Sequence, residues 1–139
     1  MDGHKYEHAV AQFLRHNGYS NVIVTRASGD YGADIIATKR GRKYAIQCKY
    51  YSNPVGLKAV QEVVASKKHY RCSRAMVVTN NTYTKAARRL AEENGVTLLE
   101  NVKPKGFGES GIPLVPIIIA IIILGVGVGI LLSKILFNI

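Results

Sequence analysis

Residues 28–50 read SGDYGADIIATKRGRKYAIQCKY, two largely apolar runs on either side of a short basic turn. The runs, 33–38 and 43–51, are predicted to be strands because they are rich in β-branched, aromatic and small apolar residues. Between them KRGR (39–42) predicts a tight connection in which Gly41 supplies the left-handed backbone conformation. The stretch therefore predicts an antiparallel hairpin.

The hairpin determines which side chains face one another. With Arg40 and Gly41 at its tip, Asp34 lies opposite Gln47. Because side chains alternate between the two faces of a strand, Lys49 shares the face of these two residues. Directly opposed Cβ atoms are about 4.5–5.5 Å apart. A carboxylate, an amide oxygen and an ammonium are therefore predicted to converge on one patch.

This trio is suited to hydrolysis of a phosphodiester. Mg²⁺ prefers oxygen ligands, so Asp34 would anchor the ion and Gln47 would complete the ligand set without adding charge. Lys49 would orient or deprotonate the attacking water and stabilise the developing negative charge. An ordinary cross-strand ion pair between Asp34 and Lys49 is the alternative interpretation.

The rest of the chain to residue 100 predicts helices and strands around this hairpin. Apolar spacing near three and four residues predicts helices, and the run AMVVT (75–79) is typical of a strand that is buried on both faces. The predicted order is α-β-β-β-α-β-α-β. Outside the hairpin, the predicted elements are helix 4–17, strand 22–24, helix 57–70, strand 75–79, helix 84–94 and strand 96–99.

Four motifs of the chain resemble the Mrr-like restriction endonuclease family, a branch of the PD-(D/E)xK nuclease superfamily. They are SGDYGADII (28–36), AIQCKY (45–50), PVG (54–56) and VVTN (77–80). The resemblance covers about residues 3–100. It implies a restriction-endonuclease-like α/β fold with an αβββαβ core and a mixed central sheet.

The resemblance also implies roles for individual residues. The family's motif aspartate falls on Asp34, and its Gln-x-Lys variant falls on Gln47 and Lys49. The acidic residue that family members use from the first helix falls on Glu7. The implied catalytic set is thus Asp34, Gln47, Lys49 and Glu7. The first two and Glu7 would bind Mg²⁺, with Mn²⁺ as the alternative ion.

Two of these assignments have competing explanations. Glu7 could instead be a glutamate near the start of a helix that complements the helix dipole. Gln47 occupies a position that is acidic in the wider superfamily, so it could weaken metal binding or mark a descendant that only binds DNA. We also expect Gln61, on the second long helix, to pack toward the site.

The chain is strongly basic, with 19 Lys and Arg against 9 Asp and Glu, and this balance favours a polyanionic partner. Four basic residues at the hairpin tip are predicted to contact DNA phosphates next to the catalytic face: Lys39, Arg40, Arg42 and Lys43. Charges that merely keep the turn soluble are the alternative. No base-reading motif is evident, so we expect little sequence specificity from this chain alone, or cleavage that is directed by DNA structure, modification or a partner.

Residues 112–132 contain no charged residue and are long enough to span a bilayer as one helix. We therefore predict a nuclease domain (1–100), a linker (101–111), a transmembrane helix (112–132) and a short extracytoplasmic tail (133–139). All basic residues except Lys134 precede the span, which places the N-terminal domain in the cytoplasm by the positive-inside rule. A homodimer is predicted through the nuclease domain or through the small-residue face of Gly125 and Gly129.

Together these features predict a membrane-anchored, metal-dependent DNA endonuclease of the restriction or defence type. The alternative from another class is a non-catalytic module that tethers nucleic acid to the membrane, which would bind DNA in a salt-sensitive manner without cutting it. A third possibility is a basic surface that binds anionic lipid. Cleavage that depends on Asp34 and Lys49 separates the first from the other two.

Overall fold

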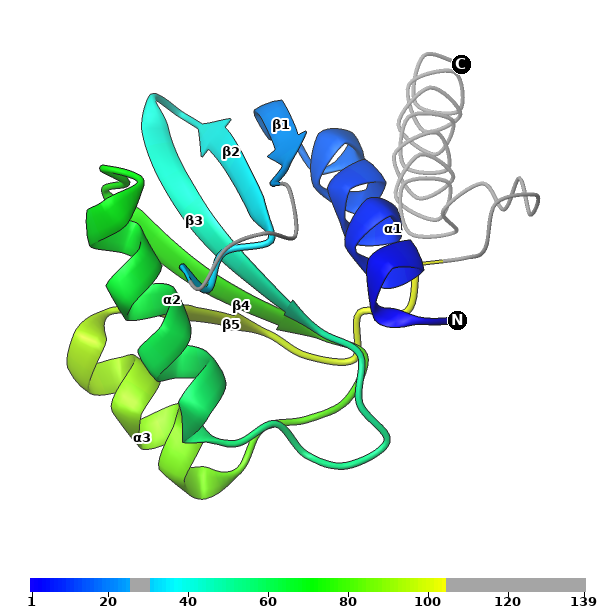
Figure 1. Ribbon diagram of the computed structural model, residues 1–139, viewed down its shortest axis with the longest axis vertical. Helices are drawn as coiled ribbons and strands as arrows, with labels where there is room; N and C mark the ends of the chain where they lie inside the picture. The colour runs from blue at the N-terminus through cyan, green and yellow to red at the C-terminus, as the bar shows by residue number, and fades with distance from the viewer. Residues whose placement is uncertain (26–30, 105–139) are drawn as a thin grey trace, which may run out of the picture. The chain divides into compact units, whose positions relative to one another are not determined.

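The computed structural model describes residues 1–25 and 31–104, which belong to one compact unit, Met1–Phe107. Their elements are α1 (Gly3–His16), β1 (Ser20–Val24), β2 (Ile35–Lys39), β3 (Arg42–Lys49), α2 (Leu57–His69), β4 (Arg74–Thr79), α3 (Lys85–Asn94) and β5 (Thr97–Leu99). The predicted order of helices and strands is confirmed (Figure 1).

The five strands form one mixed sheet in the order β1-β2-β3-β4-β5. The pairs β1–β2 and β2–β3 are antiparallel, whereas β3–β4 and β4–β5 are parallel. Ile36 pairs with Ala45, so the hairpin has the predicted register. Arg40 and Gly41 at its tip have φ angles of 50° and 71°, as the favoured two-residue hairpin turn requires. The left-handed backbone predicted at Gly41 is therefore confirmed.

Helices cover both faces of the sheet (Figure 1). One hydrophobic cluster joins α1 to one face and includes Tyr6, Leu14, Ile35 and Ile46. The other joins α2 and α3 to the opposite face. Because both faces are covered, the strand centres are apolar, and the buried polar side chains Gln47 and Thr79 lie toward the C-terminal ends of β3 and β4.

The domain's contacts continue slightly past the predicted boundary at residue 100. The backbone N–H of Val102 donates to the Thr79 carbonyl at 2.9 Å, and the Tyr6 hydroxyl donates to the Val102 carbonyl at 2.9 Å. These bonds join the segment after β5 to β4 and to α1. Residues 101 and 102 are therefore part of the domain rather than of a free linker.

The predicted transmembrane helix (112–132) and tail (133–139) lie outside the described residues, as do Gly125 and Gly129. Within the two described ranges, 1–25 and 31–104, no helix combines the length and the hydropathy needed to cross a membrane.

Candidate active site

Asp34 is held at the start of β2 by three hydrogen bonds. Its backbone N–H donates to the Ile46 carbonyl at 2.8 Å, and its carbonyl accepts from the N–H of Thr25 at 2.8 Å. Its carboxylate Oδ2 accepts from the backbone N–H of Cys48 at 2.7 Å. Asp34 therefore lies against residues 46–48 of β3, which is where the hairpin register predicted it.

Gln47 lies on β3 between two buried apolar residues and is itself only 6% exposed. Its side-chain oxygen, Oε1, is buried and has no hydrogen-bond partner among the described residues. Burying an amide oxygen without a partner is costly, about 1–3 kcal/mol. This oxygen beside Asp34 is therefore suited to a ligand such as a metal ion.

Lys49 is the last residue of β3, and its amine forms an ion pair with a carboxylate from α2. Lys49 Nζ lies 2.9 Å from Glu62 Oε2, and the two side chains are 17% and 28% exposed. The Nζ atom also lies 5.9 Å from the centre of the Tyr51 ring. The alternative interpretation, an ordinary ion pair between Lys49 and Asp34, is not what the structure has: Lys49 pairs with Glu62, although the charge of Asp34 still acts on Lys49.

Electrostatics at the site favour the proton on Asp34 and on Lys49. Burial raises the pKa of Asp34 to about 6; the Cys48 N–H and Lys49 oppose this rise, and the charges of Glu7 and Glu62 add to it. Burial alone would lower the pKa of Lys49, but the hydrogen bond and charge of Glu62 outweigh it and raise that pKa above its ordinary value. Lys49 is therefore an ammonium at neutral pH, which favours the electrostatic role over deprotonation of water.

Glu7 approaches the site from α1, on the other side of the sheet. The first turns of α1 lie beside the end of β3 (Figure 1). There the rings of Tyr6, on α1, and Tyr50, directly after β3, are 5.2 Å apart. The Glu7 side chain is partly buried, 18% exposed, and lies 3.4 Å from Nδ1 of the exposed His4. Its charge contributes to the raised pKa of Asp34, so the two carboxylates influence each other, and a shared metal ion stays a prediction.

The residues present fit a hard divalent cation. Asp34, Glu7 and Gln47 offer two carboxylates and one amide oxygen, the ligand type that Mg²⁺ and Mn²⁺ prefer. Within residues 1–25 and 31–104, no three His, Cys, Asp or Glu side chains are grouped closely enough to hold a metal by themselves. A bound ion at this site would therefore need the Gln47 oxygen and water as well.

The basic residues of the hairpin tip do not lie next to this site, and that part of the prediction is wrong. The tip is at the opposite end of β3, and the eight residues from Arg42 to Lys49, seven steps of about 3.3 Å each, span about 23 Å. Lys43 Nζ donates to the Tyr70 carbonyl at 2.8 Å, whereas Lys39 Nζ donates to that of Asn17 at 2.9 Å.

Three hairpin-tip residues, Lys39, Arg40 and Arg42, line a hollow of about 400 Å³ together with Tyr19 and Tyr44. Their DNA-binding role stays a prediction, but it would apply to DNA at a distance from the reacting phosphate.

Glu62 is the residue of the site that the sequence interpretation missed, because it favoured the neighbouring Gln61. Gln61 is exposed, whereas Glu62 reaches Lys49. The sequence alone did not favour Glu62 over Gln61; only the observed burial of Ala59, Val60 and Val63 places Glu62 beside the buried face of α2.

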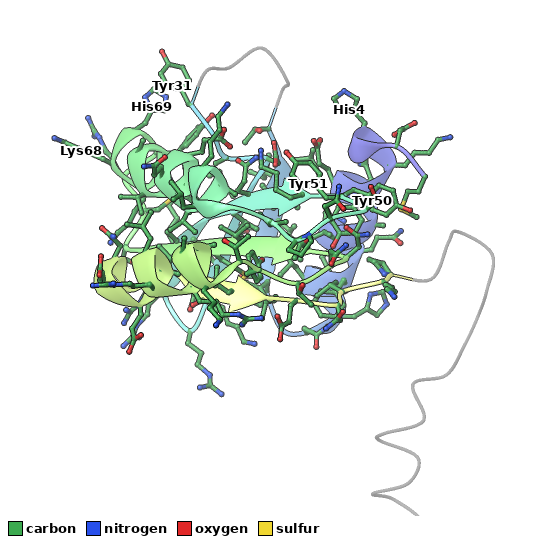
Figure 2. The ribbon with its side chains drawn as sticks, turned by 90° about the horizontal axis from the view of Figure 1, so that it is seen from below. His4, Tyr31, Tyr50, Tyr51, Lys68 and His69 are labelled. Carbon is green, nitrogen blue, oxygen red and sulfur yellow. The ribbon has the colours of Figure 1, made fainter. Side chains whose placement is uncertain are left out.

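Three tyrosine side chains, Tyr31, Tyr50 and Tyr51, are exposed on the surface. Tyr31 stacks on His69 with ring centres 3.6 Å apart, whereas Tyr50 and Tyr51 lie elsewhere on the surface (Figure 2).

Comparisons with known structures support the fold. A protein of unknown function, AF1548, has a TM-score of 0.59 and 22% identity over 75% of this chain and 61% of its own. The DNA modification-dependent restriction endonuclease AspBHI has a TM-score of 0.55 and 20% identity over 70% of this chain and 28% of its own. The MspJI restriction endonuclease, in complex with a 27-mer oligonucleotide, has a TM-score of 0.50 and 21% identity over 68% and 24%.

This chain spans less than two thirds of each of those proteins, and at such identities the likeness establishes the fold alone. No curated protein matches the chain in sequence. The family model of Mrr_cat, described as a restriction endonuclease, matches residues 1–103, which include Glu7, Asp34, Gln47 and Lys49. The chain therefore belongs to the Mrr_cat restriction endonuclease family.

Proposed function

We propose that this chain is a divalent-metal-dependent DNA endonuclease that hydrolyses phosphodiester bonds at the site of Asp34, Gln47 and Lys49. The observation that carries the proposal is the buried Oε1 of Gln47, which has no hydrogen-bond partner within residues 1–25 and 31–104, across the hairpin from a carboxylate, Asp34, whose pKa is raised to about 6. A buried acceptor and an electrostatically destabilised carboxylate are both relieved by a bound cation. Family membership supplies the reaction class.

Each residue of the site would have its own role in hydrolysis. Asp34, Gln47 and Glu7 would hold Mg²⁺ or Mn²⁺, which when bound supplies a Lewis acid and an activated water. Lys49 would place its ammonium on the scissile phosphate and stabilise the charge that develops there. The net charge of +10 would favour DNA over neutral substrates.

Cleavage assays on the purified full chain test this proposal. We expect nicking or cutting of plasmid DNA in Mg²⁺ or Mn²⁺, on methylated or unmethylated substrate, and no cleavage in excess chelator. Salt-sensitive DNA binding without cleavage in either metal would contradict the endonuclease and favour the non-catalytic tethering module.

We further propose that residues 112–132 anchor the domain to the membrane as a single span, with the N-terminal domain in the cytoplasm. The support is the uncharged stretch of sequence and the basic residues that precede it. After cell fractionation we expect the full chain in the membrane pellet even after alkaline carbonate washing. Release by that wash would contradict the span, and protease protection of the N-terminal domain in intact cells tests the orientation.

A further inference from the structure

The site contains one carboxylate that the proposed metal ligands do not include. Glu62 extends from α2 and its Oε2 lies 2.9 Å from Lys49 Nζ. We propose that Glu62 is a positioning residue: it holds the Lys49 ammonium at the site and acts through that lysine rather than as a metal ligand. This inference rests on the proposed endonuclease function.

The ion pair differs from the surface pairs of the same chain. Arg89 and Glu93 on α3 also pair, at 3.2 Å, but their side chains are 84% and 56% exposed. Lys49 and Glu62 are 17% and 28% exposed, so water screens them less. A lysine side chain carries a compact charge on a flexible stem of four carbons, so a partner is needed to hold its ammonium in one position.

A second, independent observation is that Glu62 is itself held in place by the loop that leads to Asp34. A Cβ atom built on Gly32 would lie 2.7 Å from the Glu62 carbonyl oxygen and 2.9 Å from the Glu62 Cβ. Gly32 also has a φ of 69°, which favours glycine. The glycine of the Gly32-Ala33-Asp34 motif thus lets α2 pack directly on the segment that carries Asp34. The same packing sets the positions of Asp34 and Glu62.

The ion pair with Lys49 and the close approach of Gly32 explain why Glu62 positions the Lys49 amine instead of binding the metal ion. Its carboxylate is already engaged by Lys49, whereas Glu7 approaches from α1 and the Gln47 oxygen has no partner within the described residues. Glu62 therefore counterbalances the ammonium on the α2 side of the site. Glu7, Asp34 and Gln47 remain available to a cation.

Steady-state cleavage kinetics of the full chain in Mg²⁺ test the inference with Glu62→Gln, which keeps the shape and removes the charge. We expect kcat to fall by about ten- to a hundredfold, as small misplacement of a reacting group does, with KM within about twofold of wild type. The Mg²⁺ concentration for half-maximal rate should also stay within about twofold. Glu93→Gln, which removes a carboxylate from the exposed pair, should leave all three unchanged.

DNA binding in the absence of divalent metal is a second measurement, and here Glu62→Gln is not expected to cause a loss. Glu62→Gln removes a negative charge from the site, so we expect DNA binding equal to or tighter than that of wild type. Damage to the fold would weaken binding and cleavage together and would overturn the inference. Glu62→Asp keeps the charge but shortens its reach by one methylene, so its kcat should lie between wild type and Glu62→Gln.

The outcomes separate this inference from the proposed function. A cleaving wild type with an unchanged kcat in Glu62→Gln would overturn only the role of Glu62. Recovery of the wild-type rate at high Mg²⁺ would also overturn it, because Glu62 would then be a metal ligand. A wild-type chain inactive in both Mg²⁺ and Mn²⁺ would overturn the proposed function and this inference together.

Discussion

Asp34→Asn is expected to lower DNA cleavage by at least about a hundredfold, because one charged oxygen ligand of the proposed cation is lost at the centre of the site. Asparagine has the same shape, and its side-chain oxygen can still accept the hydrogen bond from the Cys48 N–H. The local structure should therefore survive. Plasmid nicking in Mg²⁺ and in Mn²⁺, compared with wild type at equal protein concentration, measures the loss.

Although Asp34→Asn should lose cleavage, its free energy of unfolding at neutral pH should not fall. The pKa of Asp34 is raised from 3.8 to about 6, so the folded protein favours the protonated form more than the unfolded chain does. Without metal, this carboxyl therefore makes the free energy of unfolding fall as pH rises from about 4 to 6, with no further change above that range.

Asp34→Asn should lose this contribution and be at least as stable as wild type at pH 7, because it has no ionised carboxylate to bury. Thermal unfolding of wild type and of Asp34→Asn in chelator, at pH 4.5 and at pH 7, measures this difference in stability. An Asn variant that melts well below wild type at pH 7 would mean that its inactivity reflects misfolding.

Added Mg²⁺ should raise the melting temperature of wild type more than that of the variant, since a ligand stabilises the state that binds it.

The hairpin was predictable because two local rules agree. Gly41 marks the tip, and strand alternation then assigns every side chain to a face. Once Ile36 pairs with Ala45, Asp34 must lie beside Gln47 whatever the rest of the chain does. The buried strand β4 was equally clear, because its run of small and branched apolar residues suits a strand covered on both faces.

Glu62 could not be assigned in this way. Helical periodicity gives the apolar stripe of α2, but the choice between Gln61 and Glu62 depends on how the helix is rotated about its axis. In the structure that rotation brings the backbone at Glu62 close to Gly32, thirty residues away in the chain. Local sequence carries no record of such a contact.

The position of the hairpin-tip cations is a different kind of error. The hairpin-tip residues lie on the same two strands as the active site, and for that reason the two were predicted to be close together. The length of the strands alone excludes this. From the tip to Lys49, β3 runs for all of its eight residues, and each residue adds about 3.3 Å. The sequence therefore contained the information needed to place these charges far from the reacting phosphate.

Gly32→Ala is expected to have the largest effect on stability. Its Cβ would lie 2.7 Å from a backbone oxygen, which cannot swing away as the end of a flexible side chain can. Alanine would also have to adopt a φ of 69°, a conformation that costs about 1–2 kcal/mol, and overpacking adds about 1–3 kcal/mol. We therefore expect a loss of about 2–5 kcal/mol, measured by thermal unfolding of the full chain.

Gly41→Ala separates the two causes of that loss. Gly41 has nearly the same φ, 71°, but nothing lies within 4 Å of the Cβ position, so only the backbone conformation is penalised. For a domain of about 100 residues, 1 kcal/mol lowers the melting temperature by about 4–8 °C. Gly32→Ala should therefore melt well below Gly41→Ala, and it should lose cleavage because Glu62 and Asp34 are displaced together. Equal melting temperatures would show that the contact between Gly32 and α2 does not fix the helix, and the packing argument for Glu62 would fail with it.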